Sequence, residues 1–274
     1  MLKQRLIFGI LGAVLAVGVV VFCPVKVVGI ILALIALIGL GEFYNVTGLF
    51  KKKTPAVLLG FAFCLSVFYG AVFAPDKMYE YALIVFVVYV FLLMTVMVFF
   101  RSKCTFADCA ISFAGAVYIS VFFAHIILLR QLEAGKLLIW VLFISAWGTD
   151  TCAYFAGRAL GKHKLCPSIS PKKTVEGAIG GTLGCILLVG VYLGIIANVN
   201  GLSVNWLNTV VVSALAALFS QIGDLAASCI KRDNNSKDYG NLIPGHGGIL
   251  DRFDSVLLIS PLCFYLMVYL PVLC

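Results

Sequence analysis

The chain has 274 residues, of which 62% are hydrophobic and 12% are charged, against about 25% charged in an ordinary soluble domain. So much apolar surface cannot be buried inside a water-soluble globule of this length, and the composition excludes that class. The net charge of +8 would suit a nucleic-acid-binding protein. However, the basic residues stand beside the ends of apolar runs, as the bias of Lys and Arg toward cytoplasmic loops predicts. We therefore expect an all-α polytopic membrane protein with no nucleic-acid partner.

Nine apolar runs approach or exceed the roughly 20 residues that cross the hydrocarbon core of a bilayer. The N-terminal run starts with basic residues, as a signal peptide does, but lacks an obvious cleavage site, so we interpret it as an uncleaved first span. With the N-terminus in the cytoplasm, sixteen basic residues fall inside and four outside, which predicts a C-terminus outside. The expected spans are 6–22, 25–44, 56–74, 79–100, 106–129, 136–157, 175–198, 205–227 and 255–273.

The first five spans, residues 1–135, are rich in Val, Ile, Leu and Phe and carry little chemistry. We predict that they are mainly structural. Glu42, at the inner end of the second span, is interpreted as an interfacial or helix-packing carboxylate, and His125 as a packed or interfacial histidine. Residues 136–274, which hold four spans and long cytoplasmic loops, are predicted to form the catalytic part.

The sixth span carries polar groups on one helical face, because Asp150, Tyr154 and Arg158 recur four residues apart. Asp150 lies well inside the apolar run, and acids at such positions usually pair, bind a cation or line a wet cavity. A structural pair with Lys or Arg is the alternative for Asp150. The G-x-x-x-G-K-H stretch that follows has the wrong spacing for a phosphate-binding loop, so we reject that motif.

The segment SISPKKTVEG, which ends at Gly177, precedes the seventh span. Lys172 and Lys173 stand just before the predicted start of a helix, where free N–H groups and the helix dipole favour an anion. An ordinary basic flank is the alternative, but Ser170, Thr174 and Glu176 make the segment more specific. Within the span, glycines four residues apart predict close helix packing: Gly177 and Gly181, Gly180 and Gly184, and Gly190 and Gly194.

The eighth span and the loop after it hold the densest charge in the chain. Gln221, Asp224, Ser228 and Lys231 form a polar stripe at helical spacing. The glycine-rich turn PGHGG around His246 follows, and then two acids three residues apart. The acids Asp150, Asp224, Asp251 and Asp254 together offer the hard oxygen ligands that Mg²⁺ prefers, and the interleaved Lys and Arg side chains suit phosphate.

Residues 228–254 resemble the signature of the CDP-diacylglycerol synthases, also called phosphatidate cytidylyltransferases. The family pattern S-x-apolar-K-R, four residues, K-D, then P-x-H-G-G-apolar-x-D-R-x-D is met at every position. The stretches SPKKTVEG, QIGDLAAS and DTCAYFAGR are also similar to family motifs, although Val175 stands where many members carry an aromatic residue. The resemblance is strong over residues 147–254.

The resemblance implies transfer of the cytidylyl group from CTP to phosphatidate, giving CDP-diacylglycerol and pyrophosphate. It implies CTP, phosphatidate and the bilayer as partners, Mg²⁺ with a candidate second cation as cofactor, and a homodimer as a candidate assembly. The implied catalytic residues are Asp224, Asp251, Lys231, Arg232, His246 and Arg252. The implied substrate-binding residues are Ser170, Lys172, Lys173, Thr174, Glu176, Ser228, Lys237, Asp238, Gly247 and Gly248. The implied metal ligands are Asp224 and Asp251, with Asp254 and Asp150 as further carboxylates.

Two other classes of protein compete with this interpretation. A cation- or proton-coupled transporter would use Asp150 and Asp224 at a midplane ion site, but it leaves the long basic loop unexplained. Another CTP-using lipid enzyme, such as a polyprenol or diacylglycerol kinase, is a closer rival; the HGG-x-x-D-R-x-D ending favours cytidylyl transfer. The CDP-alcohol phosphotransferases are excluded because their D-G-x-x-A-R run is absent. A non-enzymatic scaffold would not need this charge cluster.

Overall fold

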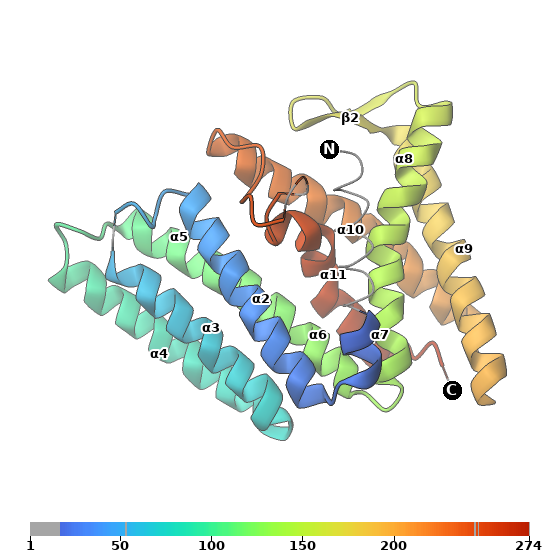
Figure 1. The fold of residues 1–274 in the computed structure, drawn as a ribbon, viewed down its shortest axis with the longest axis horizontal. Helices are drawn as coiled ribbons and strands as arrows, with labels where there is room; N and C mark the ends of the chain where they lie inside the picture. Colours follow the sequence, from blue (N-terminus) through green and yellow to red (C-terminus); the bar gives the residue numbers. More distant parts are fainter. Residues whose placement is uncertain (1–16, 53, 244, 246, 274) are drawn as a thin grey trace. The chain divides into compact units, whose positions relative to one another are not determined.

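The computed structural model describes residues 17–52, 54–243, 245 and 247–273 (Figure 1). Within these residues, eight helices are long and apolar enough to cross a membrane. They match eight of the nine expected spans, which confirms a helical, multi-pass membrane protein. The expected first span, 6–22, lies mostly outside the described residues, as do Lys3 and Arg5.

The spans run close to the predicted bounds, and two of them contain a short π-helical segment. The first four are α2 (Val25–Val46), α3 (Pro55–Phe73), α4 (Met78–Phe99, after the 3-10 turn η1, Pro75–Lys77) and α5–η2–α6 (Phe106–Ala116, Val117–Val121, Phe122–Gln131). The second four are α7–η3–α8 (Gly135–Phe143, Ile144–Gly148, Thr149–Leu160), α9 (Val175–Asn200), α10 (Trp206–Asp233) and α11 (Leu250–Tyr269).

Local signals in the sequence explain where several helices begin and end. Pro55 opens α3, at the first helical position, where a missing N–H costs nothing. Thr105 and Asp108 form a reciprocal capping box at the start of α5. The Thr174 hydroxyl accepts the N–H of Gly177 and caps α9. At the other end, α9 stops at Gly201, whose φ of +67° suits glycine best.

The chain divides into two compact units, which we describe separately. The first comprises Met1–Leu128 with Asn234–Arg252, and the second comprises Leu129–Asp233 with Phe253–Cys274. Helix α11 contributes its first residues to the first unit and the rest to the second. This structural division differs from the functional division at residue 135, which stays a prediction.

A group of buried, hydrogen-bonded hydroxyls lies in the core of the first unit, between apolar helices. The buried Tyr44 hydroxyl donates to the Ser112 carbonyl at 3.0 Å, and the Ser112 hydroxyl donates to the Ala56 carbonyl at 2.7 Å. The Tyr89 hydroxyl lies 3.0 Å from the Ser112 hydroxyl oxygen. Because buried hydroxyls in an apolar setting must be hydrogen-bonded, these contacts hold α2, α3, α4 and α5 in one register.

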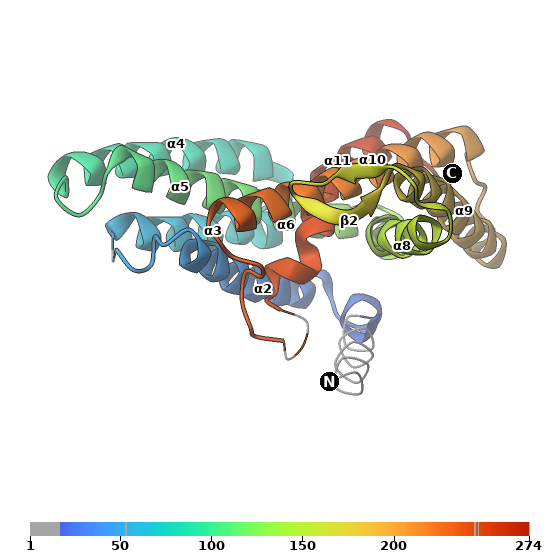
Figure 2. The same cartoon turned by 90° about the horizontal axis from the view of Figure 1, so that it is seen from above.

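The second unit contains a two-stranded antiparallel hairpin that the all-α prediction missed. Its strands are β1 (Lys164–Cys166) and β2 (Ser170–Thr174), with Lys164 opposite Thr174; Figure 2 shows the hairpin beside α8 and α9. The Glu176 carboxylate accepts the N–H groups of Lys162 and His163 and so ties the hairpin base to α9. The strands lack apolar alternation, the usual sequence signal for a strand, which is why the prediction failed here.

The glycines of α9 pack in two different ways. A Cβ on Gly180 would overlap the Cβ of Ala156 on α8, and a Cβ on Gly184 would lie 2.5 Å from the Cys152 sulfur. Gly177 and Gly181 likewise face α8, so the predicted close approach is confirmed for both of these pairs. A Cβ on Gly190 would meet nothing nearer than the Trp206 ring at 3.8 Å, an ordinary contact.

We expect Gly180→Ala to destabilise the protein by about 1–3 kcal/mol, the usual cost of overpacking a filled interface. Gly190→Ala is the matched control, because it gains the same helix propensity without a clash. Thermal unfolding in detergent should give Gly180→Ala the lower melting temperature by several degrees, at about 2–4 °C per kcal/mol. Equal melting temperatures would contradict tight α8–α9 packing at this position.

Candidate functional site

A polar cavity of about 310 Å³ lies within the second unit, where α8, the hairpin, α9 and α10 meet. It brings together the three clusters that the sequence singled out between residues 147 and 232. Its charged lining residues are Asp150 and Arg158 from α8, Lys172 and Lys173 from β2, and Asp224 from α10. Both signs of charge therefore face one space.

The centre of this cavity is an ion pair between two predicted site residues. Lys173 Nζ lies 2.6 Å from Asp224 Oδ2, and each side chain keeps about a quarter of its surface exposed. The ammonium nitrogen itself is buried. Because a charge out of water needs a partner, Asp224 holds the Lys173 ammonium inside the cavity and β2 against α10.

Three of the four predicted metal ligands gather in the second unit. The Ser255 hydroxyl donates to Asp150 Oδ2 at 3.1 Å, and the adjacent Asp254 lies within electrostatic reach of Asp224, Asp150 and Lys231. Like charges so placed repel one another unless cations balance them, and the buried Lys231 with Lys173 supplies part of that balance. The acids and the lysines thus form one coupled charge network.

The suitability of these acids for a metal ion depends on their chemistry. In the part of the chain that the structure describes, no three Asp, Glu, His or Cys side chains are already arranged as a metal cage. Mg²⁺ commonly takes only one or two carboxylates and completes its shell with water and substrate phosphate. The hard oxygens of Asp150, Asp224 and Asp254 fit that mode of binding.

The glycine loop before α11 is organised within the first unit by two carboxylates. Asp251 Oδ2 accepts the N–H of Tyr239 at 2.8 Å and of Gly248 at 2.9 Å. Glu42 accepts the N–H of Ile249 on Oε1 and of Leu250 on Oε2, both at 2.9 Å. The four N–H groups hold both carboxylates in fixed orientations, and an acid suits the N-terminus of α11.

Glu42 is a packing carboxylate, as the sequence predicts, but its partner lies in a distant part of the chain. It was expected to be an interfacial or packing carboxylate, and it does pack, but against the loop of the predicted signature. A Cβ on Gly248 would overlap its carboxylate, and one on Gly240 would lie 2.6 Å from Oε1. The contact joins residues about 200 positions apart in the chain, so no local pattern reveals it.

The remaining predicted site residues differ in exposure. Thr174 is buried as the cap of α9, and Glu176 binds the hairpin base, including the His163 ring at 2.6 Å. Ser170 and Ser228 are half-buried. Four loop and helix-end residues are exposed: Arg232, Lys237, Asp238 and Arg252. Gly247 adopts a φ of +84°, whereas His246 lies outside the described residues.

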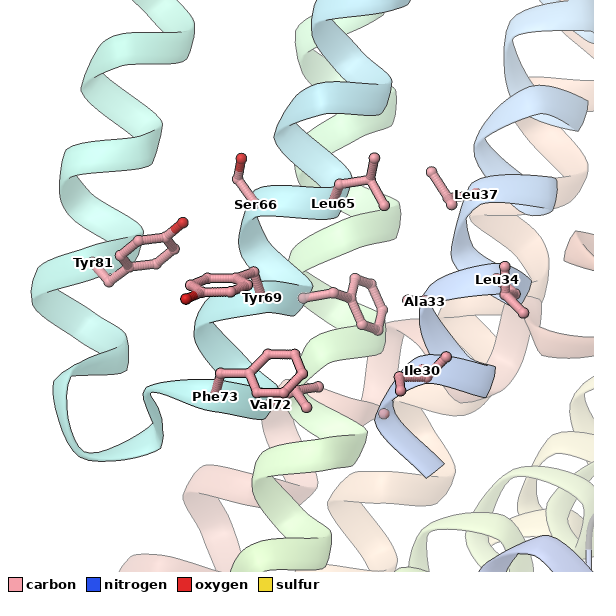
Figure 3. Close-up of a pocket in the computed structure, with 12 residues that line it drawn as sticks. Ile30, Ala33, Leu34, Leu37, Leu65, Ser66, Tyr69, Val72, Phe73 and Tyr81 are labelled. Carbon is pink, nitrogen blue, oxygen red and sulfur yellow. The ribbon is translucent and has the colours of Figure 1, made fainter. Parts of the chain in front are cut away.

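A larger cavity of about 480 Å³ lies elsewhere, in the first unit between α2, α3 and α4 (Figure 3). Its lining is almost entirely apolar and aromatic, with Tyr69, Phe73 and Tyr81 at one end. None of the twelve residues that line it is an acid or a base. It therefore offers no charged side chain to bind a phosphate group or a metal ion.

Comparison with known proteins gives a consistent result. A model described as the cytidylyltransferase family matches residues 3–270. A phosphatidate cytidylyltransferase of Bacillus subtilis (strain 168) is 33% identical over 270 residues, which is 97% of each chain. One of Staphylococcus haemolyticus is 33% identical over 257 residues, 92% of this chain and 96% of the relative. One of Staphylococcus saprophyticus is 39% identical over 178 residues, 65% of this chain and 66% of the relative.

Proposed function

The chain belongs to the cytidylyltransferase family, and from that premise we propose which of its residues bind the substrates and the metal ion. The protein is an enzyme that transfers the cytidylyl group of CTP to phosphatidate. The products are CDP-diacylglycerol and pyrophosphate. The resemblance drawn from residues 228–254 is thereby confirmed at the level of family and reaction.

The reaction sets the demands on the site. A phosphate oxygen of phosphatidate attacks the α-phosphorus of CTP, a new P–O bond forms, and the bond to the leaving pyrophosphate breaks. The nucleophile is already an anion, so no strong base is needed. The protein must bring two highly charged anions together and stabilise the charge that develops on the phosphoryl oxygens.

We assign the polar cavity of the second unit to this task. Its cationic side chains, Arg158, Lys172 and Lys173, neutralise phosphate groups, and the ion pair of Lys173 with Asp224 is the observation that carries the assignment. An incoming phosphate would compete for the Lys173 ammonium, and the Asp224 carboxylate would then be available to hold a cation. The substrate anion and the metal ion are therefore expected to bind cooperatively.

Asp224, with Asp254 and Asp150 as further carboxylates, would hold Mg²⁺ and a candidate second cation. When bound, Mg²⁺ supplies positive charge to the phosphate oxygens. We also propose that Asp251, in the first unit, binds a cation. The Tyr239 and Gly248 N–H groups orient its carboxylate. Replacing each acid alone with the matching amide tests it.

The remaining signature residues are assigned by their chemistry. Lys231, Arg232, Lys237, and Arg252 neutralise phosphate, and His246 donates to a phosphate oxygen. Gly247 and Gly248 let the backbone approach the nucleotide closely. Ser170, Thr174, Glu176, Ser228 and Asp238 bind or position the substrates; for Thr174 and Glu176 the contacts with the α9 cap and the hairpin base favour positioning.

The topology proposed is nine spans with the N-terminus in the cytoplasm and the C-terminus outside. The sixteen basic residues on the inner side of that arrangement support it. It puts the hairpin lysines and the polar cavity on the cytoplasmic face of the cell membrane, where CTP is available. A homodimer remains the candidate assembly, to be decided by the mass of the purified protein in detergent.

The activity is tested with purified protein, phosphatidate, Mg²⁺ and CTP labelled at the α-phosphorus. We expect the label to appear in a lipid together with free pyrophosphate. A kinase would transfer the γ-phosphate and leave the α-phosphorus in the nucleotide. CTP labelled at the α-phosphorus and CTP labelled at the γ-phosphorus therefore distinguish the two reactions. Label transferred to diacylglycerol or polyprenol instead of phosphatidate would redirect the assignment, and no lipid-linked label would reject it.

Removing divalent cations with EDTA should lower the rate to below about one tenth, because the carboxylates and the triphosphate then lack their counter-charge. Adding excess Mg²⁺ should restore it. An equal concentration of EDTA saturated with Mg²⁺ beforehand is the control for chelator effects. A rate that is insensitive to chelation would contradict the cation assignment while leaving the cytidylyl transfer itself intact.

A further inference from the structure

A second cavity adjoins the polar cavity within the second unit. Its volume is about 430 Å³, and α9, α10 and β1 line it. Apart from Thr182, Gln221 and Cys166 its lining is aliphatic. We call this cavity the apolar groove, defined by Ile179, Leu183, Leu218, Ile222 and Leu225.

The apolar groove and the polar cavity share part of their walls. Leu165, Ala178 and Gln221 line both. The Gln221 amide nitrogen lies 3.3 Å from the Ala178 carbonyl and 3.3 Å from the Thr182 hydroxyl, so its polar end is turned onto α9 and fixed there. A single molecule with a charged end and an apolar end therefore finds adjoining sites of matching character.

The groove also has the exposure expected of a site open to lipid. Ile179 and Leu183 on α9 are 58% and 62% exposed, and Leu218 and Ile222 on α10 are both 49% exposed. These residues lie on spanning helices, where exposed aliphatic side chains face hydrocarbon. Leu183 lies eight residues after Val175, the first residue of α9, which corresponds to about 12 Å along the helix. The groove thus leads from the lysines along α9 into the apolar part of the span.

We propose, resting on the proposed function, that the apolar groove binds an acyl chain of phosphatidate. The polar cavity holds the phosphate of the same molecule through Lys172, Lys173 and Arg158. CTP has no apolar portion that would use the groove, whereas phosphatidate needs both environments at once. The groove makes the enzyme's efficiency depend on the length of the acyl chain, since each buried methylene contributes about fourfold in affinity.

In the test, a tryptophan side chain fills the groove, either from α9 in Leu183→Trp or from α10 in Ile222→Trp. Leu187→Trp is the matched control, because Leu187 lies one turn further along α9, is 66% exposed, and lines neither cavity. The full-length protein is assayed with dioleoyl phosphatidate and with dihexanoyl phosphatidate. We expect the ratio of kcat/KM for the long over the short substrate to fall at least about tenfold in both groove variants, as the loss of two buried methylenes predicts. The control should keep the ratio of the unsubstituted protein, and KM for CTP should stay unchanged in all three.

The comparison within each variant separates this proposal from its alternatives. A variant that is partly misfolded loses activity on both lipids and leaves the ratio unchanged, so the ratio reports the groove alone. If groove variants whose thermal unfolding matches that of the unsubstituted protein keep its long-over-short ratio, as Leu187→Trp is expected to, the acyl-chain assignment is overturned. Absence of CDP-diacylglycerol with the unsubstituted protein would instead reject the proposed function.

Discussion

Replacing Asp224 with Asn should lower kcat by about 10²–10³-fold, the usual cost of removing one charge-stabilising group from a phosphoryl- or acyl-transfer site. The amide keeps the size of the side chain but loses its charge. Lys173 then loses the partner that holds it 2.6 Å away, and the proposed cation loses a ligand. The Mg²⁺ concentration that gives half-maximal rate should rise as well, a change that a merely structural role would not produce.

Asp233→Asn is the matched control for this prediction. Asp233 is the last residue of the same helix and is exposed, so its replacement should change kcat by less than about twofold, as surface substitutions usually do. Steady-state kinetics over a range of Mg²⁺ concentrations measures both variants. If Asp224→Asn retained normal turnover and normal Mg²⁺ dependence, neither its metal role nor its role toward Lys173 would hold.

Gly248→Ala is expected to lower kcat/KM by about 10²-fold, because a displacement near 1 Å in a catalytic constellation costs that much. The added Cβ overlaps the Glu42 carboxylate, which holds the N–H groups of Ile249 and Leu250 at 2.9 Å. Either the loop or the carboxylate must move. The Gly248 N–H that Asp251 accepts moves with the loop.

The same contact can be removed from its other side. Glu42→Ala takes away the carboxylate and leaves room for the new Cβ. We therefore expect Gly248→Ala to lower kcat/KM much less in the Glu42→Ala background than in the unsubstituted protein, so that the two effects are non-additive. Gly190→Ala serves as the control glycine. Additive losses in the double variant would show that Gly248 acts through something other than Glu42.

Folding, turnover and lipid preference are expected to depend on different residues of this protein. The α8–α9 glycines are expected to govern folding, whereas Asp224 and Gly248 govern turnover in a protein that still folds. The residues of the apolar groove are expected to change the preference for phosphatidate with long acyl chains over phosphatidate with short ones.

Much of the fold follows from the sequence, because a membrane-spanning helix is a local property. Every backbone N–H and C=O in hydrocarbon must be bonded within its own segment, so a long apolar run is enough to specify a helix such as α9. The polar stripe from Gln221 to Lys231 was likewise predictable from helical spacing and is confirmed, as α10 continues to Asp233. The hairpin escaped prediction because its strands are short, basic and without alternation.

The reaction was also predictable from the sequence, through the resemblance of residues 147–254 to a known family, and the spacing of lysines, acids and glycines there indicated candidate site residues. What only the tertiary structure decided is which of these groups meet. Lys173 pairs with Asp224, Glu42 holds the loop before α11, and an apolar groove adjoins the polar cavity along Gln221. Each of these contacts joins segments far apart in the chain. They depend on how helices pack, and helix packing is set by side-chain shape over whole interfaces rather than by any local pattern.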